Sequence, residues 1–255
     1  MKAITFTGGL GAQILSAAAY FYLEKCAMPV SAVLDYFNIP ERIAKPGNKG
    51  EISIWKWELH HMYLAPDRFN QISLPTSEII QDGEEKIRLG FLGLKDREIR
   101  SYFVLHDQIK DIKANQIGLG SYACVHIRRG DYLNVASLVV DDNDFMKAIE
   151  AVSELVPTLL VITDTPLEPE FIDQLRTLQI KTKVIVGGEP IVAHGLMRLS
   201  DILICSNSQF SYTAAALREP TKLTMLPVQH DVDLNSPTNQ LLGSIKKFQL
   251  LTGFA

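Results

Sequence analysis

Short apolar runs alternate with amphipathic stretches over the second half of the chain, from residue 121 to about residue 227. The apolar runs are typical of buried strands, and the stretches between them repeat apolar residues at helical spacing. We expect strands at Tyr122–Ile127 and at residues 159–162, 182–186, 202–205 and 222–226, with helices at residues 142–155, 169–179, 192–200 and 210–217. This alternation predicts a parallel sheet with helices on both faces.

The start of the chain has the same pattern. A strand at residues 2–7, a glycine turn at 8–11 and an amphipathic helix at 12–27 lead to a further strand at 30–34. The section that follows, to residue 118, is less regular: residues 84–94 are interrupted by glycines, and a helix is expected only at 107–116. The chain is therefore expected to contain two α/β domains, an N-terminal domain at 1–118 and a C-terminal domain at 119–255.

The composition is that of an ordinary globular protein. Hydrophobic residues make up 47% and charged residues 21%, and the formal net charge of -4 gives no reason to expect a nucleic acid as partner. The three cysteines are odd in number and stand in apolar surroundings, so we expect buried free thiols in a reducing compartment. No cysteine or histidine spacing predicts a metal site.

The N-terminal residues show no long apolar run of the kind that forms a signal peptide or a membrane anchor. We therefore expect a cytoplasmic protein, which is compatible with peripheral association with the inner face of a membrane. The oligomeric state does not follow from the sequence.

Polar groups follow several of the predicted strands. Because the ligand crevice of an open parallel sheet lies beyond the carboxyl ends of its strands, residues 8–11, 128–131, 163–164 and 206–211 are candidates for one binding site.

The pair Arg128 and Arg129 is the most informative of these groups. A buried arginine needs an anionic partner, and a planar guanidinium can hold two phosphate oxygens at once. One arginine can reach a ligand while the other binds Asp131 or a backbone carbonyl; a purely structural Arg–Asp pair is the alternative. His126, inside the strand, is by type more often a hydrogen-bonded core residue than a catalyst.

The other groups each have a structural alternative as well. The glycine turn in TGGLGAQ lets a ligand approach the backbone, but it lacks the third glycine of the dinucleotide fingerprint and the Lys-Ser/Thr of a P-loop, so it can also be a tight turn. Four polar residues crowd the start of the helix after residue 205, where capping needs one, and this favours an anion. Asp164 can bind a ribose or a base, or cap the next helix.

Together these motifs resemble the alpha-1,2-fucosyltransferases of glycosyltransferase family 11. The family's His-x-Arg-Arg-x-Asp motif, shared with alpha-1,6- and some protein O-fucosyltransferases, is matched at residues 126–131. Its Gly-Gly-Leu-Gly-Asn-Gln segment is matched at 8–13 with Ala12 in place of asparagine. Its Ser-Asp-Asp is matched in part at 163–165, and its Asn-Ser-x-Phe-Ser-Trp-Trp is matched at 207–211, with Tyr212 and Thr213 in place of the tryptophans.

The resemblance implies a GT-B-like α/β fold, in which two Rossmann-like domains with parallel sheets face a central cleft. It implies an acceptor-side N-terminal domain and a C-terminal domain that binds the GDP-sugar. The implied reaction moves fucose from GDP-fucose to an oligosaccharide or glycan hydroxyl, in alpha-1,2 linkage to a galactoside, with inversion and with no metal or other cofactor.

The resemblance also implies roles for individual residues. Arg128 would stabilise the GDP leaving group, and Asp131 would join it as a catalytic residue. The donor-binding residues would be Gly9, Gly11, Gln13, His126, Arg129, Asp164, Asn207, Ser208 and Ser211. The general base is not identified, and its candidates are Asp131, Asp141, Asp142 and Glu189.

Two alternatives remain open. The departures at Ala12, Thr165 and Tyr212 are compatible with a catalytically silent relative that binds a nucleotide or glycan or scaffolds a partner, or with a transferase that uses another GDP-sugar. A nicotinamide-dependent oxidoreductase is disfavoured, because the glycine pattern is incomplete and Asp35 lacks its usual glycine partners.

Overall fold

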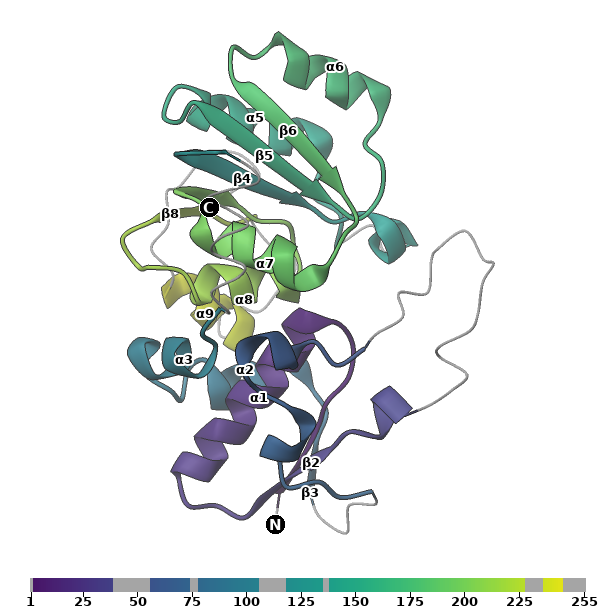
Figure 1. Cartoon of the computed structure of the whole chain (residues 1–255), viewed down its shortest axis with the longest axis vertical. Helices are drawn as coiled ribbons and strands as arrows, with labels where there is room; N and C mark the ends of the chain where they lie inside the picture. The colour runs from purple at the N-terminus through teal and green to yellow at the C-terminus, as the bar shows by residue number, and fades with distance from the viewer. Residues whose placement is uncertain are drawn as a thin grey trace. The chain divides into compact units, whose positions relative to one another are not determined.

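The computed structural model describes residues 2–38, 56–73, 78–105, 118–134, 138–227 and 236–244, and the chain divides into two compact units (Figure 1). Each unit is described by itself. The first contains the N-terminal elements and also the late helix α9 (Pro237–Ser244), and the second contains the remaining elements from Tyr122 onward. The sequence analysis placed all of residues 119–255 in one domain, whereas helix α9 belongs to the first unit. The expected helix at 107–116 lies outside the described residues.

The second unit is built on a five-stranded parallel sheet of order β6-β5-β4-β7-β8. Its strands are β4 (Tyr122–Ile127), β5 (Thr158–Thr163), β6 (Lys181–Val186), β7 (Ile202–Ile204) and β8 (Leu223–Met225). Its helices are α5 (Asp142–Ser153), α6 (Pro169–Thr177), α7 (Pro190–Leu199) and α8 (Gln209–Ala216), with a short 3-10 helix η6 (Gly130–Asn134) after β4. The strand and helix alternation predicted from residue 121 onward is confirmed, and β4 lies at the centre of the sheet.

Helices cover both faces of this sheet, so β4 is buried along its whole length (Figure 1). Ala123, Val125 and Ile127 pack in one core with the apolar side chains of α5 and α6. The alternate residues point to the other face, where Tyr122 Oη donates a hydrogen bond to the carbonyl of Leu196 in α7 at 2.7 Å. This alternation turns His126 toward α8 and away from the core under α5 and α6.

A buried arginine ties the amino ends of the strands together on this side of the sheet. Arg218 follows α8 and is 3% exposed. Its Nη1 donates to the carbonyl of Leu223 at 2.9 Å and to Thr224 Oγ1 at 3.0 Å. Its Nη2 donates to the carbonyls of Ser200 at 2.8 Å and Asp201 at 3.2 Å. Arg218 therefore joins the end of α7 to the starts of β7 and β8.

The first unit has a smaller parallel sheet of order β2-β1-β3 among its described residues. The strands are β1 (Lys2–Thr5), β2 (Val30–Val33) and β3 (Glu78–Ile80), and the helices besides α9 are α1 (Leu10–Lys25), α2 (Gly83–Gly90) and α3 (Asp96–Tyr102). The described residues of this unit also form the 3-10 helices η1 (Asp35–Asn38), η3 (Leu59–Met62) and η4 (Pro66–Arg68). The opening strand, glycine turn and helix are confirmed, as is the α/β fold class with two Rossmann-like units that each contain a parallel sheet.

Helix α2 lies in the glycine-interrupted stretch at residues 84–94, for which the sequence pattern predicted no helix. Asp82 caps the helix, since its Oδ2 accepts the backbone N–H of Glu85 at 3.2 Å. Gly90 ends the helix where it packs on α1: a Cβ at this position would lie 2.6 Å from Ala18 Cβ. The glycine therefore allows close contact between two helices and does not interrupt the fold.

The three cysteines differ in exposure. Cys124 and Cys205 are buried, and burial raises the pKa of both thiols, that of Cys205 to about 12. The expectation of a buried thiol is wrong for Cys26, which is exposed at the C-terminal end of α1, where the chain turns toward β2. Within the described residues, no helix is both long enough and apolar enough to cross a membrane.

Candidate functional site

Three of the four polar segments predicted from the sequence come together at the carboxyl ends of β4, β5 and β7. Because β4 pairs with β5 on one side and with β7 on the other, the residues that follow these strands are neighbours. This edge of the second unit contains Arg128 and Asp131 after β4, Asp164 after β5, and the serines after β7. The fourth segment, the glycine turn, belongs to the first unit.

Arg128 extends from the end of β4 between two carboxylates. Its Nη1 lies 2.8 Å from Asp164 Oδ2, and its Nη2 is paired with Asp131 Oδ1. The Arg128 side chain is 19% exposed and its guanidinium lies over the ring of Tyr132, with 5.3 Å from Cζ to the ring centroid. Asp164 is 22% exposed, whereas Asp131 is 62% exposed. The structure thus gives Arg128 one sheltered partner and one that faces water.

Asp164 fixes the loop after β4 and does not cap the next helix, α6, whose N-cap is Glu168. Its Oδ1 accepts the backbone N–H of Arg129 at 2.8 Å while Oδ2 pairs with Arg128. Gly130 is needed for this approach, because its φ is +32° and a Cβ there would lie 2.5 Å from Asp164 Oδ2. The carboxylate therefore holds both the backbone and the guanidinium of the loop in place.

Arg129 points in a different direction and secures helix α5. Its Nη1 donates to the carbonyl of Val140 at 2.9 Å, and its Nη2 pairs with Asp142 at the start of α5. The guanidinium also lies 5.5 Å from the ring centroid of Phe145. The two arginines diverge, and each is paired with aspartate: Arg128 binds Asp131 and Asp164, whereas Arg129, which is 12% exposed, binds Asp142 and a backbone carbonyl.

A chain of polar groups joins β4 to the start of α8. His126 Nδ1 lies 2.5 Å from Ser211 Oγ and 2.9 Å from Ser206 Oγ, and the two serine oxygens are 3.0 Å apart. Ser208 is the N-cap of α8, and its Oγ accepts the backbone N–H of Ser211 at 3.2 Å. Asn207 Oδ1 accepts a hydrogen bond from Tyr212 Oη at 2.7 Å. Capping accounts for Ser208, and the other two serines form a buried hydroxyl cluster with His126.

His126 is neutral in this arrangement. It is 4% exposed, and burial together with the nearby Arg128 charge lowers its pKa from 6.5 to about 3. Burial also lowers the pKa of His194, whose ring, like that of His126, packs against Phe210. The cluster therefore holds its hydroxyls beside an uncharged imidazole.

The low pKa of His126 predicts a pH dependence of stability. Between pH 6.5 and about 3 the unfolded chain binds a proton at His126 and the folded chain does not, so the free energy of unfolding decreases as the pH is lowered through this window. We expect His126→Asn, which keeps a side-chain acceptor, to reduce this slope by about 1.4 kcal/mol per pH unit in urea unfolding measurements. His194 retains part of the dependence. An unchanged slope in His126→Asn would contradict the neutral buried imidazole.

In the first unit, the glycine turn after β1 is held from the side by Gln13. Gly8 has a φ of +71°, Gly9 is the N-cap of α1, and Gly11 is buried in the first turn of the helix. Gln13 is fully buried, and its Nε2 donates to the carbonyls of Gly8 at 3.0 Å and Lys56 at 2.8 Å. Its position favours a structural link between the turn and the backbone at Lys56.

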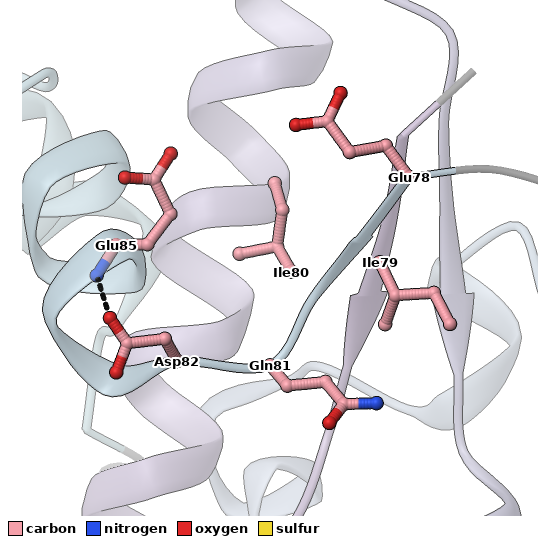
Figure 2. A pocket seen from close by; sticks show the side chains of 6 residues that line it. All are labelled: Glu78, Ile79, Ile80, Gln81, Asp82 and Glu85. Atoms are coloured by element: carbon pink, nitrogen blue, oxygen red, sulfur yellow. Dashed lines mark hydrogen bonds between the residues drawn. The ribbon is translucent and has the colours of Figure 1, made fainter.

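A pocket of about 460 Å³ lies in the first unit, where β3 leads into α2. The side chains that line it are drawn in Figure 2. Three of its lining side chains are carboxylates: Asp82 caps α2, Glu85 pairs with Arg88, and Glu78 pairs with Lys2. Since all three carry negative charge, they would repel a phosphate group. This pocket therefore does not suit the donor expected from the sequence.

The structure assigns other contacts to most of the predicted general-base candidates. Asp141 caps α5, Asp142 pairs with Arg129, and Asp131 pairs with Arg128. The sequence analysis did not single out Glu58, whose backbone N–H donates to Gln13 Oε1 at 2.9 Å, or His61, whose Nε2 lies 3.9 Å from Glu58 Oε2. Among the described residues, no group of three or more His, Cys, Asp and Glu side chains could hold a metal ion.

The two parallel-sheet units place the chain in the GT-B-like class of folds, and comparisons with solved structures agree. The crystal structure of POFUT1 in complex with GDP is similar over 85% of this chain and 94% of that chain, with 14% identity and a TM-score of 0.50. The structure of E. coli ADP-heptose LPS heptosyltransferase II is similar over 99% of this chain and 92% of that chain, with 13% identity and a TM-score of 0.50. No protein-family model and no curated protein matches the sequence. The likeness at these identities is one of fold.

Proposed function

We propose that this protein is a glycosyltransferase that moves fucose from GDP-fucose to a hydroxyl group of an oligosaccharide or glycan, in alpha-1,2 linkage to a galactoside. The observation that carries the proposal is the position of Arg128. Its guanidinium stands at the carboxyl end of the central strand, anchored by Asp164, and the same strand carries His126, which contacts the buried serine cluster at the start of α8. The shared fold with POFUT1, which was solved in complex with GDP, supports the choice of nucleotide.

The chemistry of the reaction explains why such groups are needed. When the bond between the anomeric carbon and the β-phosphate oxygen breaks, the electron pair stays on the diphosphate, and fixed positive groups must stabilise it. Arg128 supplies a full charge. The N-terminal amides of α8 supply partial charge, and the buried cluster of Ser206, Ser211 and His126 fixes the start of that helix. This set performs the task without a metal ion, and attack of the acceptor from the opposite side gives inversion.

The two carboxylates around Arg128 have different roles in this proposal. Asp164 is sheltered and holds the loop, so it keeps the guanidinium in position while the nucleotide binds. Asp131 is 62% exposed, so its side chain can turn into water and give up its place on Arg128 Nη2 to a phosphate oxygen. Arg129 acts indirectly: it joins the loop after β4 to the start of α5 and so supports the shape of the loop that carries Arg128.

Isothermal titration of the purified protein with GDP, GDP-fucose, ADP, UDP and NAD tests the proposal. In the presence of EDTA, GDP and GDP-fucose are expected to bind at least about tenfold more tightly than the other three, a difference of about 1.4 kcal/mol or more. Stronger binding of ADP, UDP or NAD would contradict the choice of donor. Binding of GDP without GDP release from GDP-fucose would favour the catalytically silent alternative.

A further inference from the structure

We propose that Tyr132 is a positioning residue of the nucleotide site, and that its aromatic ring keeps the guanidinium of Arg128 in one orientation while the diphosphate binds; this inference rests on the proposed function. The distance from Arg128 Cζ to the centroid of the Tyr132 ring is 5.3 Å. A cation within about 6 Å of an aromatic face is attracted by the ring quadrupole. The ring is therefore a partner of Arg128 in addition to Asp164 and Asp131.

The backbone of the loop after β4 fixes this ring beside the arginine. Tyr132 lies in η6, which begins at Gly130, and its backbone N–H donates to the carbonyl of Arg129 at 2.7 Å. The chain therefore turns back directly after the two arginines. Tyr132 is half-buried, and burial raises the pKa of its phenol, so the side chain is uncharged at neutral pH. A neutral ring thus lies against the guanidinium.

The ring binds the guanidinium differently from the two carboxylates. Asp164 and Asp131 pair with the in-plane N–H groups of Arg128, at Nη1 and Nη2, whereas a contact through the ring face uses no N–H donor. In the proposed function a phosphate oxygen takes the place of Asp131 on Nη2. The ring contact is compatible with this exchange, because it competes for neither nitrogen. It can therefore hold the guanidinium before and after the nucleotide binds.

Loss of the ring would leave the guanidinium less well fixed at the moment when its orientation matters. Once a phosphate displaces Asp131, Asp164 is the carboxylate that still pairs with Arg128 among the described residues. A single ion pair at Nη1 permits the plane of the guanidinium to tilt, and two-point contact with a phosphate requires a fixed plane. We therefore expect weaker GDP binding without the ring.

Titration of the full chain with GDP tests the assignment. Tyr132→Leu removes the ring and is expected to weaken GDP binding about tenfold. Tyr132→Phe retains the ring and is expected to lose much less, with an affinity within about threefold of the wild type. Leu133→Ala is the matched control, because Leu133 is the next residue of η6 and is 62% exposed. It is expected to change the affinity by no more than about twofold.

Two further measurements separate positioning of Arg128 from a general effect on the loop. Pentafluorophenylalanine in place of Tyr132 has nearly the size of phenylalanine but a reversed quadrupole, so it is expected to weaken GDP binding about tenfold while the protein folds as the phenylalanine variant does. In the Arg128→Ala background, Tyr132→Leu is expected to change GDP affinity by less than about twofold, because no guanidinium remains for the ring to hold.

Several outcomes would overturn the assignment and leave the proposed function in place. These are an unchanged affinity in the pentafluorophenylalanine variant, an equal loss in Leu133→Ala, and the same loss from Tyr132→Leu with and without Arg128. Wild-type protein that binds no GDP would instead overturn the proposed function, and the assignment with it.

Discussion

Replacement of Arg128 by alanine is expected to abolish transfer while the protein stays folded. The variant loses the guanidinium assigned to the proposed diphosphate site and leaves the carboxylates of Asp164 and Asp131 without their cation. Loss of a single group that stabilises developing negative charge lowers the rate about 100-fold or more, and the two unpaired carboxylates weaken nucleotide binding as well. Both effects are measured, by GDP release from GDP-fucose and by titration with GDP.

A surface arginine provides the control for this variant. Arg176 is 75% exposed and pairs with Asp173 on the outside of α6, so Arg176→Ala is expected to leave GDP affinity and rate unchanged. Arg128→Lys keeps the charge but loses the planar fork, and should fall between the wild type and Arg128→Ala. A folded Arg128→Ala variant with wild-type GDP affinity and rate would remove the main support for the proposed function.

The second large effect is expected at Arg218, and it concerns stability. Methionine at this position has similar length but leaves the carbonyls of Ser200, Asp201 and Leu223 without the donors that now reach them. Because each buried polar group without a partner costs about 1–3 kcal/mol, Arg218→Met is expected to lower the free energy of unfolding by about 3 kcal/mol or more in urea titrations. The lower cost of burying methionine offsets only part of this loss.

The matched variant is Arg176→Met, which removes an exposed ion pair and is expected to change the free energy of unfolding by no more than about 1 kcal/mol. Arg218 lies at the amino ends of β7 and β8, whereas the candidate site lies at the carboxyl ends. The folded fraction of Arg218→Met is therefore expected to bind GDP as the wild type does. A urea midpoint equal to that of the wild type would show that the arginine does not hold these strands.

The sequence predicts the second unit well because its strands β4, β5 and β7 are buried along their whole length. Strand β4 is found at the predicted residues, and its neighbours differ by one or two residues at their ends, since a buried parallel strand shows as a continuous apolar run. Helix α2 was missed because glycine is a poor helix former, and the contact of Gly90 with Ala18 that favours it there depends on the tertiary fold.

The candidate site is predictable in its location and less so in its pairing. The polar residues after β4, β5 and β7 had to meet once the strands paired, so the cluster at this edge follows from topology. The partners of Arg128 and Arg129 do not follow from the sequence, because the carboxylates of Asp131, Asp142 and Asp164 all lie in segments that could pair with either arginine. The side chain of Gln13 holds the irregular segment at Lys56 and Glu58, and no periodic pattern in the sequence gives a signal for this contact.

The uneven burial of the cysteines has a practical consequence for studying this protein. A maleimide dye should react readily with Cys26 in the folded chain. Cys124 and Cys205 are buried and their thiol pKa values are raised, so they should react only after the second unit unfolds. The rate at which second and third labels are incorporated therefore reports how often that unit unfolds. The native chain thus contains its own probe of the unit that holds Arg128, and nucleotides can be screened by how strongly they slow the labelling.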